Sequence, residues 1–416
     1  MPPVEPSGVL IARQPILDAQ KRIHGYELLH HAPPWMATDP EESTQHVLNC
    51  LVNHFSPAVL AGGKSIFVNL TSKAVQEGAY AQLPPENTII ELQTPREAAG
   101  SELIEACQAM RVKGYKLSLD DFDPDLPSAA GLAPLADYLK FDVGSTIDTA
   151  LLSKMKAMHD GNRPIIAQGV SREEQFTAAR AAGIDLFQGF FFFKPQLLEK
   201  RDIPSIKMNY IRFIEAVSRP ELKLDELEKV IRQDAAISVA LLRLINSAAF
   251  GIRNEVKSIK QALALLGEIK VRRWAASLAA KELGAGKPVE IIGVTLTRAF
   301  FCESLGKLFR HENQLLDLFM TGIVSGLPSM LDVPLLKLLD ELSITQSIRD
   351  ALASKPTPMG NIFSLAMAHE TGAFAGLTRM IREMNIDLDK LAGAYYDATR
   401  EASAITAQVD STSAAA

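Results

Sequence analysis

Short apolar runs alternate with amphipathic stretches through the first half of the chain. Between residues 8 and 195, runs of strand length are separated by segments with apolar residues at helical spacing, as at 41–58, 101–113 and 172–182. This alternation predicts a parallel sheet with helices outside it. A short polar segment at 18–21 joins the first two runs, which predicts a hairpin and one antiparallel strand. The eight predicted strands are 9–16, 23–30, 65–70, 88–92, 115–119, 138–142, 164–168 and 186–193.

The apolar residues of the second half of the chain recur with a different period. From 204 to about 400 the apolar residues recur at helical spacing and strand alternation is hard to find, which predicts an all-α domain. Strand character is lost near 196–205, where Pro204 can start a helix. We therefore predict an α/β domain at 8–200, an all-α domain at 201–400 and a flexible C-terminal tail at 401–416.

Composition narrows the class of protein. The 416 residues are 47% apolar and 22% charged, with a net charge of −6, which is typical of a globular protein and argues against a nucleic-acid partner. The three cysteines are scattered and predict buried free thiols. The N-terminus lacks the pattern of a signal peptide, and no uncharged apolar stretch has membrane-spanning length. We expect a cytoplasmic protein without a membrane span.

Acidic and amide residues follow the predicted strands in a fixed order. An acid, an amide, an acid, an acid pair, a lysine and an amide in this order are typical of the C-terminal rim of a (β/α)₈ barrel. Carboxylates that converge there usually hold divalent metals for phosphate chemistry. The segments are GYELL at 25–29, FVNL at 67–70, IIEL at 89–92, LSLDDF at 117–122, YLKFD at 138–142, IIAQGV at 165–170 and FQGFFFFKP at 187–195.

These motifs, with ARQPI at 12–16, resemble those of the EAL domain, a barrel that hydrolyses cyclic di-GMP. The resemblance implies a modified (β/α)₈ barrel with an antiparallel first strand. It further implies that Lys140 lies beside a water between two metal ions, Mg²⁺ or Mn²⁺. The metal positions implied are Glu27, Asn69, Glu91, Asp120 and Asp121, and the cyclic di-GMP rim implied is Gln14, Glu27, His31 and Gln188.

Several residues depart from the family pattern. Gln168 and Ser171 stand where the family has glutamates, and a glutamine can neither accept a proton nor bring negative charge to a metal. Loss of a general base typically lowers a rate by about 10²–10⁴-fold. His31 replaces a phosphate-binding arginine, and Asp123 with two prolines stiffens the following loop. These departures predict a degenerate site without hydrolysis, weak cyclic di-GMP affinity, and vestigial roles for Lys140 and Gln168.

The same residues have structural interpretations. Glu27, Asn69 and Glu91 can form a hydrogen-bonded polar cluster without metal. Asp120 can cap the following turn, and Lys140 can form a buried salt bridge with Asp120 or Glu91. No cofactor would then be required, although Mg²⁺ or Mn²⁺ stays an alternative.

The stretch at 227–267 resembles the HDOD domain, an all-α relative of HD phosphohydrolases. Catalytic HD proteins hold metal through a His-Asp dyad, and here Ser325 and Gly326 stand in its place. The resemblance therefore implies an HD-related helical bundle that binds protein partners. The landmarks are Asp234, Asn246-Ser247, Phe250-Gly251, Ser258-Ile259 and Leu266-Gly267.

Together, an EAL-like barrel followed by an HDOD domain resembles a bacterial two-domain signalling protein. The sequence favours a non-catalytic regulatory adaptor, not an enzyme, that acts through protein contacts of the helical domain. The alternatives are a weak metal-dependent cyclic di-GMP phosphodiesterase and a receptor that binds cyclic di-GMP without hydrolysis.

Overall fold

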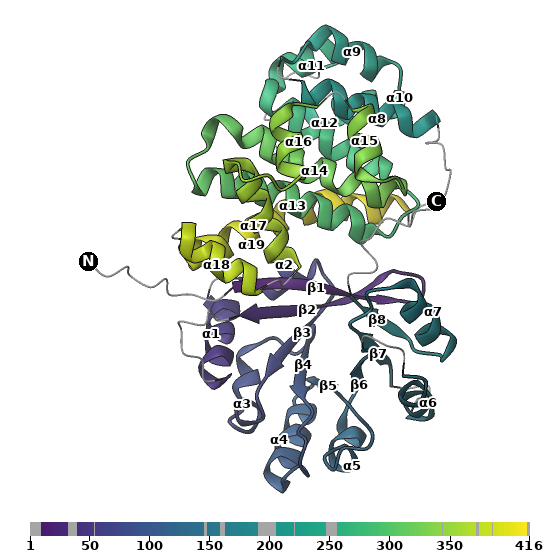
Figure 1. The fold of residues 1–416 in the computed structure, drawn as a ribbon, viewed down its shortest axis with the longest axis vertical. Coiled ribbons are helices and arrows are strands. Elements are labelled where there is room, and N and C mark those ends of the chain that lie inside the picture. The colour runs from purple at the N-terminus through teal and green to yellow at the C-terminus, as the bar shows by residue number, and fades with distance from the viewer. Residues whose placement is uncertain are drawn as a thin grey trace, which may run out of the picture. The chain divides into compact units, whose positions relative to one another are not determined.

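The chain folds into two compact units, each described by itself (Figure 1). The first combines Met1–Phe193 with Ala368–Tyr396, and the second combines Lys194–Met367 with Asp397–Ala416. The structure is a computed structural model. It describes residues 10–31, 40–53, 55–144, 148–158, 163–189, 205–219, 221–246, 256–342, 344–371, 374–384 and 386–413.

Eight strands form a closed barrel in chain order, which confirms the predicted fold. The first strand runs antiparallel to both of its neighbours, and the remaining neighbours pair in parallel, so the predicted antiparallel first strand is confirmed as well. Residues 190–193 of the last predicted strand lie outside the described part. The strands are β1 (Leu10–Asp18), β2 (Ile23–His31), β3 (Ser65–Leu70), β4 (Thr88–Gln93), β5 (Lys116–Asp120), β6 (Tyr138–Asp142), β7 (Ile165–Gln168) and β8 (Leu186–Gln188).

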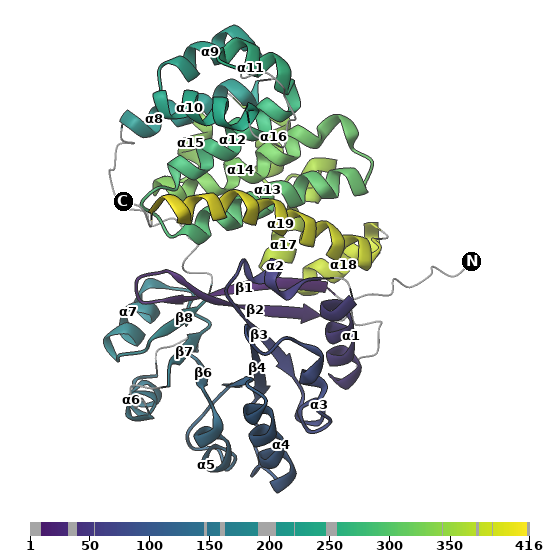
Figure 2. The same cartoon turned by 180° about the vertical axis from the view of Figure 1, so that it is seen from behind.

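Helices cover the outside of the barrel (Figure 2). The apolar side chains between strands and helices form one continuous core that includes the buried free thiol of Cys107. The helices are α1 (Pro40–Asn53), α2 (Pro57–Ala61), α3 (Ser72–Gln76), η1 (Ala79–Gln82), α4 (Ser101–Val112), α5 (Ala129–Leu132), η2 (Ala133–Leu135), α6 (Thr149–Met158) and α7 (Glu173–Ala181).

The barrel interior has an apolar layer of its own, separate from the outer core. Because strand side chains alternate between faces, residues two positions apart on a strand lie on the same interior face, and on the antiparallel β1 the rim position precedes the floor position. On six strands those positions are polar, so the interior passes from an apolar floor to a polar rim. The floor is Ile16, Phe67, Ile89, Tyr138, Ile166 and Leu186, and the matching rim positions are Gln14, Asn69, Glu91, Lys140, Gln168 and Gln188.

The second unit is helical, as the period of its apolar residues predicts. One stretch of the described residues, Glu312–Leu331, is long and apolar enough to cross a membrane, but 67% of it is buried inside the protein, as in a core helix. The helices that begin in this unit are α8 (Ser205–Ser218), α9 (Leu224–Arg232), α10 (Ala235–Ile245), α11 (Ile259–Leu266), α12 (Glu268–Leu283), α13 (Val289–Leu308), η5 (Glu312–Gln314), α14 (Leu315–Leu331), α15 (Leu335–Glu341), α16 (Gln346–Leu352) and α17 (Pro358–Glu370).

A late segment of the chain belongs to the barrel unit. It comprises the end of α17, α18 (Phe374–Met384) and the start of α19 (Leu388–Ser413). The ring of Tyr396 lies 5.1 Å from that of Phe55, and its hydroxyl oxygen accepts a hydrogen bond of 3.4 Å from the amide of Ser56. Helix α19 continues through residues 401–413, where the sequence predicts a tail. The predicted domain bounds stay predictions.

Candidate active site

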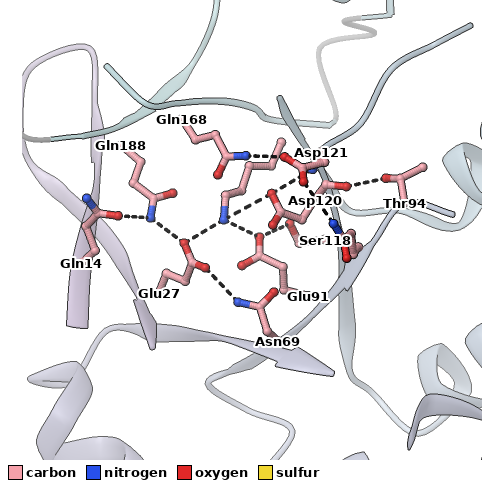
Figure 3. Close-up of polar contacts among 12 residues, drawn as sticks. Gln14, Glu27, Asn69, Glu91, Thr94, Ser118, Asp120, Asp121, Gln168 and Gln188 are labelled. Atoms are coloured by element: carbon pink, nitrogen blue, oxygen red, sulfur yellow. Dashed lines mark hydrogen bonds and ion pairs between the residues drawn. The ribbon is translucent and has the colours of Figure 1, made fainter. Parts of the chain in front are cut away.

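The polar rim centres on the ammonium group of Lys140. This side chain is completely buried, and its Nζ lies 2.7 Å from Glu27 Oε2, 3.1 Å from Glu91 Oε1 and 3.5 Å from Asp120 Oδ1 (Figure 3). The four residues come from β2, β4, β5 and β6, and the closed barrel brings them together. The predicted buried salt bridge of Lys140 is confirmed, and it includes Glu27 as well.

Amide side chains hold Glu27 in place. Asn69 Nδ2 donates to Glu27 Oε1 at 2.8 Å, and Gln188 Nε2 donates to Glu27 Oε2 at 2.6 Å. The same Gln188 nitrogen donates to Gln14 Oε1 at 2.8 Å. Glu27, Asn69, Gln14 and Gln188, which the sequence assigns to the metal set and the ligand rim, therefore form one network.

Two buried oxygen atoms of this network have no hydrogen-bond partner. Glu91 Oε1 accepts from Ser118 Oγ at 3.1 Å, whereas Glu91 Oε2 has no partner although the residue is fully buried. Gln188 Oε1, on a residue that is 2% exposed, also lacks a partner. A buried acceptor without a donor is unfavourable by roughly 1–3 kcal/mol. Such atoms indicate that the site is built for a group that can occupy them.

Burial and ion pairing shift the pKa values of the cluster in opposite directions. Burial raises the pKa of Glu91 well above its usual value, and it also raises the pKa of Asp120. Burial alone would raise the pKa of Glu27, but the ammonium and the amide donors outweigh it and lower that pKa. For Lys140, burial favours the neutral amine, but the three carboxylates outweigh it and raise its pKa. Lys140 therefore stays protonated.

Asp121 lies at the edge of this cluster with different partners. Its backbone has a φ of 47°, and its amide donates to Asp120 Oδ1 at 2.9 Å. The predicted capping of the turn by Asp120 stays a prediction. Gln168 Nε2 donates to Asp121 Oδ1 at 2.9 Å, and Gln93 Nε2 donates to Asp121 Oδ2 at 3.3 Å. Gln93 and Ser118 also belong to this network, although no sequence motif marks them. Ser118 could have been found because it lies two positions before Asp120, on the same face of β5.

A cavity of about 690 Å³ opens beside Asp121 over the ends of β3, β4 and β5. Its lining combines carboxylate, amide, hydroxyl and guanidinium groups, so it offers polar contacts to a ligand at the rim. The lining residues are Leu70, Thr71, Ser72, Leu92, Gln93, Thr94, Pro95, Arg96, Asp121, Asp123 and Leu126.

Of the other departures from the family pattern, Ser171 and Asp123 have local hydrogen-bond partners, and the side chain of His31 lies outside the described part. The backbone amide and hydroxyl of Ser171 both donate to Gln175 Oε1, at 2.9 and 3.1 Å. Asp123 accepts from the amide of Asp125 at 2.9 Å, inside its own loop. The backbone of His31 pairs with Leu10 at the end of β2. Its side chain lies outside the described part, so its predicted ligand contact stays a prediction.

The rim offers the donor atoms that hard divalent cations prefer. Glu27, Asn69, Glu91 and Asp120 carry carboxylate and amide oxygens only, which suits Mg²⁺ or Mn²⁺, and Glu91 Oε2 has no other partner. In the arrangement of the described residues, no three His, Cys, Asp or Glu side chains surround one metal position. The Lys140 ammonium lies where the carboxylates converge, so a cation must compete with it for these oxygens.

The helical unit has no comparable cluster at its predicted dyad positions. Ser325 Oγ accepts from Arg298 Nη1 at 2.8 Å and donates to the Gly322 carbonyl at 2.7 Å. A Cβ atom at Gly326 would lie 2.1 Å from Thr295 Oγ1 on α13, so close helix packing excludes an aspartate there. Asp234 and Asn246 have structural roles. Asp234 accepts from the amide at 237 near the start of α10, and Asn246 bonds both backbone groups of residue 256.

Comparison with known families identifies both units. The EAL domain family matches residues 51–195, and the HDOD domain family matches residues 203–331. The cyclic di-GMP phosphodiesterase CdgJ of Vibrio cholerae is 28% identical over 398 residues, which is 94% of this chain and 91% of CdgJ. The uncharacterized protein YuxH of Bacillus subtilis is 26% identical over 83% of this chain and 86% of its own length.

Some solved structures match part of the chain. An EAL domain protein from Listeria monocytogenes is 22% identical, with a TM-score of 0.38, over 44% of this chain and 87% of that protein. These similarities concern whole segments and do not test single positions such as Gln168 and Ser171, so the degenerate character inferred from these two residues stays a prediction.

The similarity to CdgJ corrects the functional prediction. A relative that is similar over nearly the whole of both chains is a phosphodiesterase, so the prediction of a non-catalytic adaptor without enzymatic activity is wrong. Despite Gln168 and Ser171, the buried carboxylates, Asn69 and Lys140 are all present at the rim. The chain carries an EAL domain followed by an HDOD domain.

Proposed function

We propose that this protein is a metal-dependent phosphodiesterase that hydrolyses cyclic di-GMP to the linear dinucleotide. One observation carries the proposal: Glu27, Glu91 and Asp120 converge with Asn69 and Lys140 at the polar rim of the barrel. Three carboxylates in this position are costly unless a positive charge offsets them. Similarity to CdgJ, a cyclic di-GMP phosphodiesterase, over 94% of the chain supports the same activity.

The chemistry requires water to attack phosphorus while one P–O ester bond breaks, and the leaving ribose oxygen must take up a proton to become a hydroxyl group. A divalent cation held by Glu27, Asn69, Glu91 and Asp120 would polarise the phosphate and lower the pKa of a bound water. Lys140 remains protonated, so it acts as a fixed positive charge beside the phosphate and not as a base.

The proton of the attacking water needs an acceptor at the rim. Gln168 cannot accept it, because a carboxamide has no basic site in this pH range. Asp121 is the exposed carboxylate of the set, and the Lys140 ion pairs involve the other three. We assign the proton transfer to Asp121, whose two oxygens are oriented by Gln93 and Gln168. The amide bonds fix the position of this base.

The test is incubation of the full chain with cyclic di-GMP and Mn²⁺, with chromatography of the products. We expect the linear dinucleotide with Mn²⁺ and none with EDTA. Glu91→Gln should abolish the reaction, whereas Lys154→Met, at an exposed pair with Asp125, should leave it unchanged. Absence of linear product from the folded wild-type chain with Mn²⁺ would show that the proposal is wrong.

We further propose that the helical unit binds a protein partner. Large apolar side chains are exposed on its consecutive helices α11 and α12, where Leu265 is 53% and Ile269 is 65% exposed. Exposed apolar groups of this kind are typical of protein contacts when they cluster. Leu265→Asp with Ile269→Asp should release a co-purifying partner that Leu336→Asp, also at an exposed position, retains. Equal retention by both variants would exclude this surface.

A further inference from the structure

Asp121 differs from the other rim carboxylates in what holds it. Glu27, Glu91 and Asp120 all face the Lys140 ammonium, whereas each oxygen of Asp121 accepts a hydrogen bond from a neutral carboxamide. The donors come from two strands that are not adjacent in the barrel, Gln93 at the end of β4 and Gln168 at the end of β7. Asp121 is therefore oriented from two sides without a positive charge.

The balance of charge at the rim limits how many cations it can hold. Four carboxylates and one ammonium leave three negative charges uncompensated when all groups are ionised. One divalent cation leaves the rim slightly negative, whereas two make it positive. A carboxylate at position 168 would supply one more negative charge and make the rim neutral with two cations.

At the short distance between residues 168 and 121, an amide and a carboxylate at position 168 would have opposite effects on Asp121. Gln168 Nε2 and Asp121 Oδ1 are 2.9 Å apart, a normal hydrogen bond. Two carboxylate oxygens at this distance would repel each other unless a proton or a cation lay between them. The amide removes the need for a cation at this position.

We propose that the site takes one divalent cation, bound by Glu27, Asn69, Glu91 and Asp120, and that Gln168 with Gln93 keeps Asp121 out of its coordination. This inference rests on the proposed function, because it describes the cation of the same site. A second observation points to the cation on that side. Glu91 Oε2 and Gln188 Oε1 are buried without a partner, and in Figure 3 the Gln188 oxygen points away from Gln14 toward the cluster.

The test is the number of Mn²⁺ ions bound to each full-length chain, from equilibrium dialysis and from the electron paramagnetic resonance spectrum of bound Mn²⁺. We expect one ion for the wild type and a spectrum of isolated ions. Gln168→Glu should bind two ions, a twofold increase, with the coupled spectrum of a close pair. If that variant fails to fold, Gln93→Glu, at an exposed position beside the same carboxylate, provides the same test.

Gln14→Glu is the matched control. It adds the same charge to the same network, can still accept the hydrogen bond from Gln188, and does not contact Asp121. It should bind one ion, and two ions there would show that total charge, and not position 168, sets the number.

Two coupled ions in the wild type, or no gain in either carboxylate variant that folds, would overturn the inference. Hydrolysis by a two-ion wild type would leave the proposed function standing. One bound ion without any hydrolysis would overturn the function and leave the inference standing.

Discussion

Replacement of Lys140 by methionine tests whether the rim carboxylates need a positive charge. Methionine keeps much of the volume but removes the ammonium that lies within 3.5 Å of Glu27, Glu91 and Asp120. Removal of one partner from a buried ion pair typically destabilises a protein by about 3–5 kcal/mol. Domains of about 150–250 residues lose roughly 2–4 °C in Tm for each kcal/mol, so in EDTA the barrel transition should fall by roughly 6–20 °C.

A divalent cation should reverse much of this loss, because it replaces the ammonium between the same carboxylates. Free Mn²⁺ at about 100 times its Kd would restore roughly 2.7 kcal/mol. The measurement is thermal unfolding by circular dichroism in EDTA and across a Mn²⁺ titration. Lys154→Met, which removes an exposed ammonium, is the control and should unfold like the wild type. If Lys140→Met in EDTA is as stable as the wild type, the reasoning about the buried charges is refuted.

Three further substitutions test features of both units. Gly322→Ala should destabilise by about 1–3 kcal/mol in urea unfolding, because its Cβ would lie 2.3 Å from the backbone of α13, whereas Gly293→Ala, with nothing nearer than 3.7 Å, should not. Burial lowers the pKa of His369 to about 3. The unfolded chain therefore gains a proton first as pH falls below about 6.5, and stability that is present above pH 6.5 declines by up to about 1.4 kcal/mol per pH unit. His369→Phe should flatten this acid-side slope, and an unchanged slope would contradict the assignment. Arg272→Met should destabilise by about 1–3 kcal/mol in the same assay, because this buried guanidinium donates to the Val217 carbonyl at 2.7 Å; wild-type stability would show that water replaces the bond.

The period of the apolar residues was enough to predict the alternation of strands and helices in the first half and the helical unit, whereas the barrel was predicted from the order of the polar motifs. Strand side chains alternate with period two and helix side chains with period 3.6, so local pattern fixes the type of each element. The attachment of 368–396 to the barrel unit could not be predicted in this way. It depends on contacts such as that of Phe55 with Tyr396, which are distant in sequence and leave no local pattern.

The candidate site was predictable in its members but not in its internal partners. The order of motifs placed Glu27, Glu91 and Asp120 at one rim, because parallel strands present their C-terminal ends together. The sequence could not show that Lys140 contacts all three or that two amides share Asp121, since these depend on side-chain conformations. The prediction of a non-catalytic adaptor was wrong because it rested on Gln168 and Ser171, whereas the chain retains the rim carboxylates and Lys140.

The late segment of the barrel unit bears on how the chain folds as it is made. Ala368–Tyr396 leaves the ribosome after the whole helical unit between Lys194 and Met367. At about 5–20 residues per second, this delay amounts to roughly 10–35 s. During that time Phe55 and Ser56 lack the ring and the hydroxyl of Tyr396. The ring of Phe55 in a nascent or truncated chain therefore stays without its aromatic neighbour until residues 368–396 have been made.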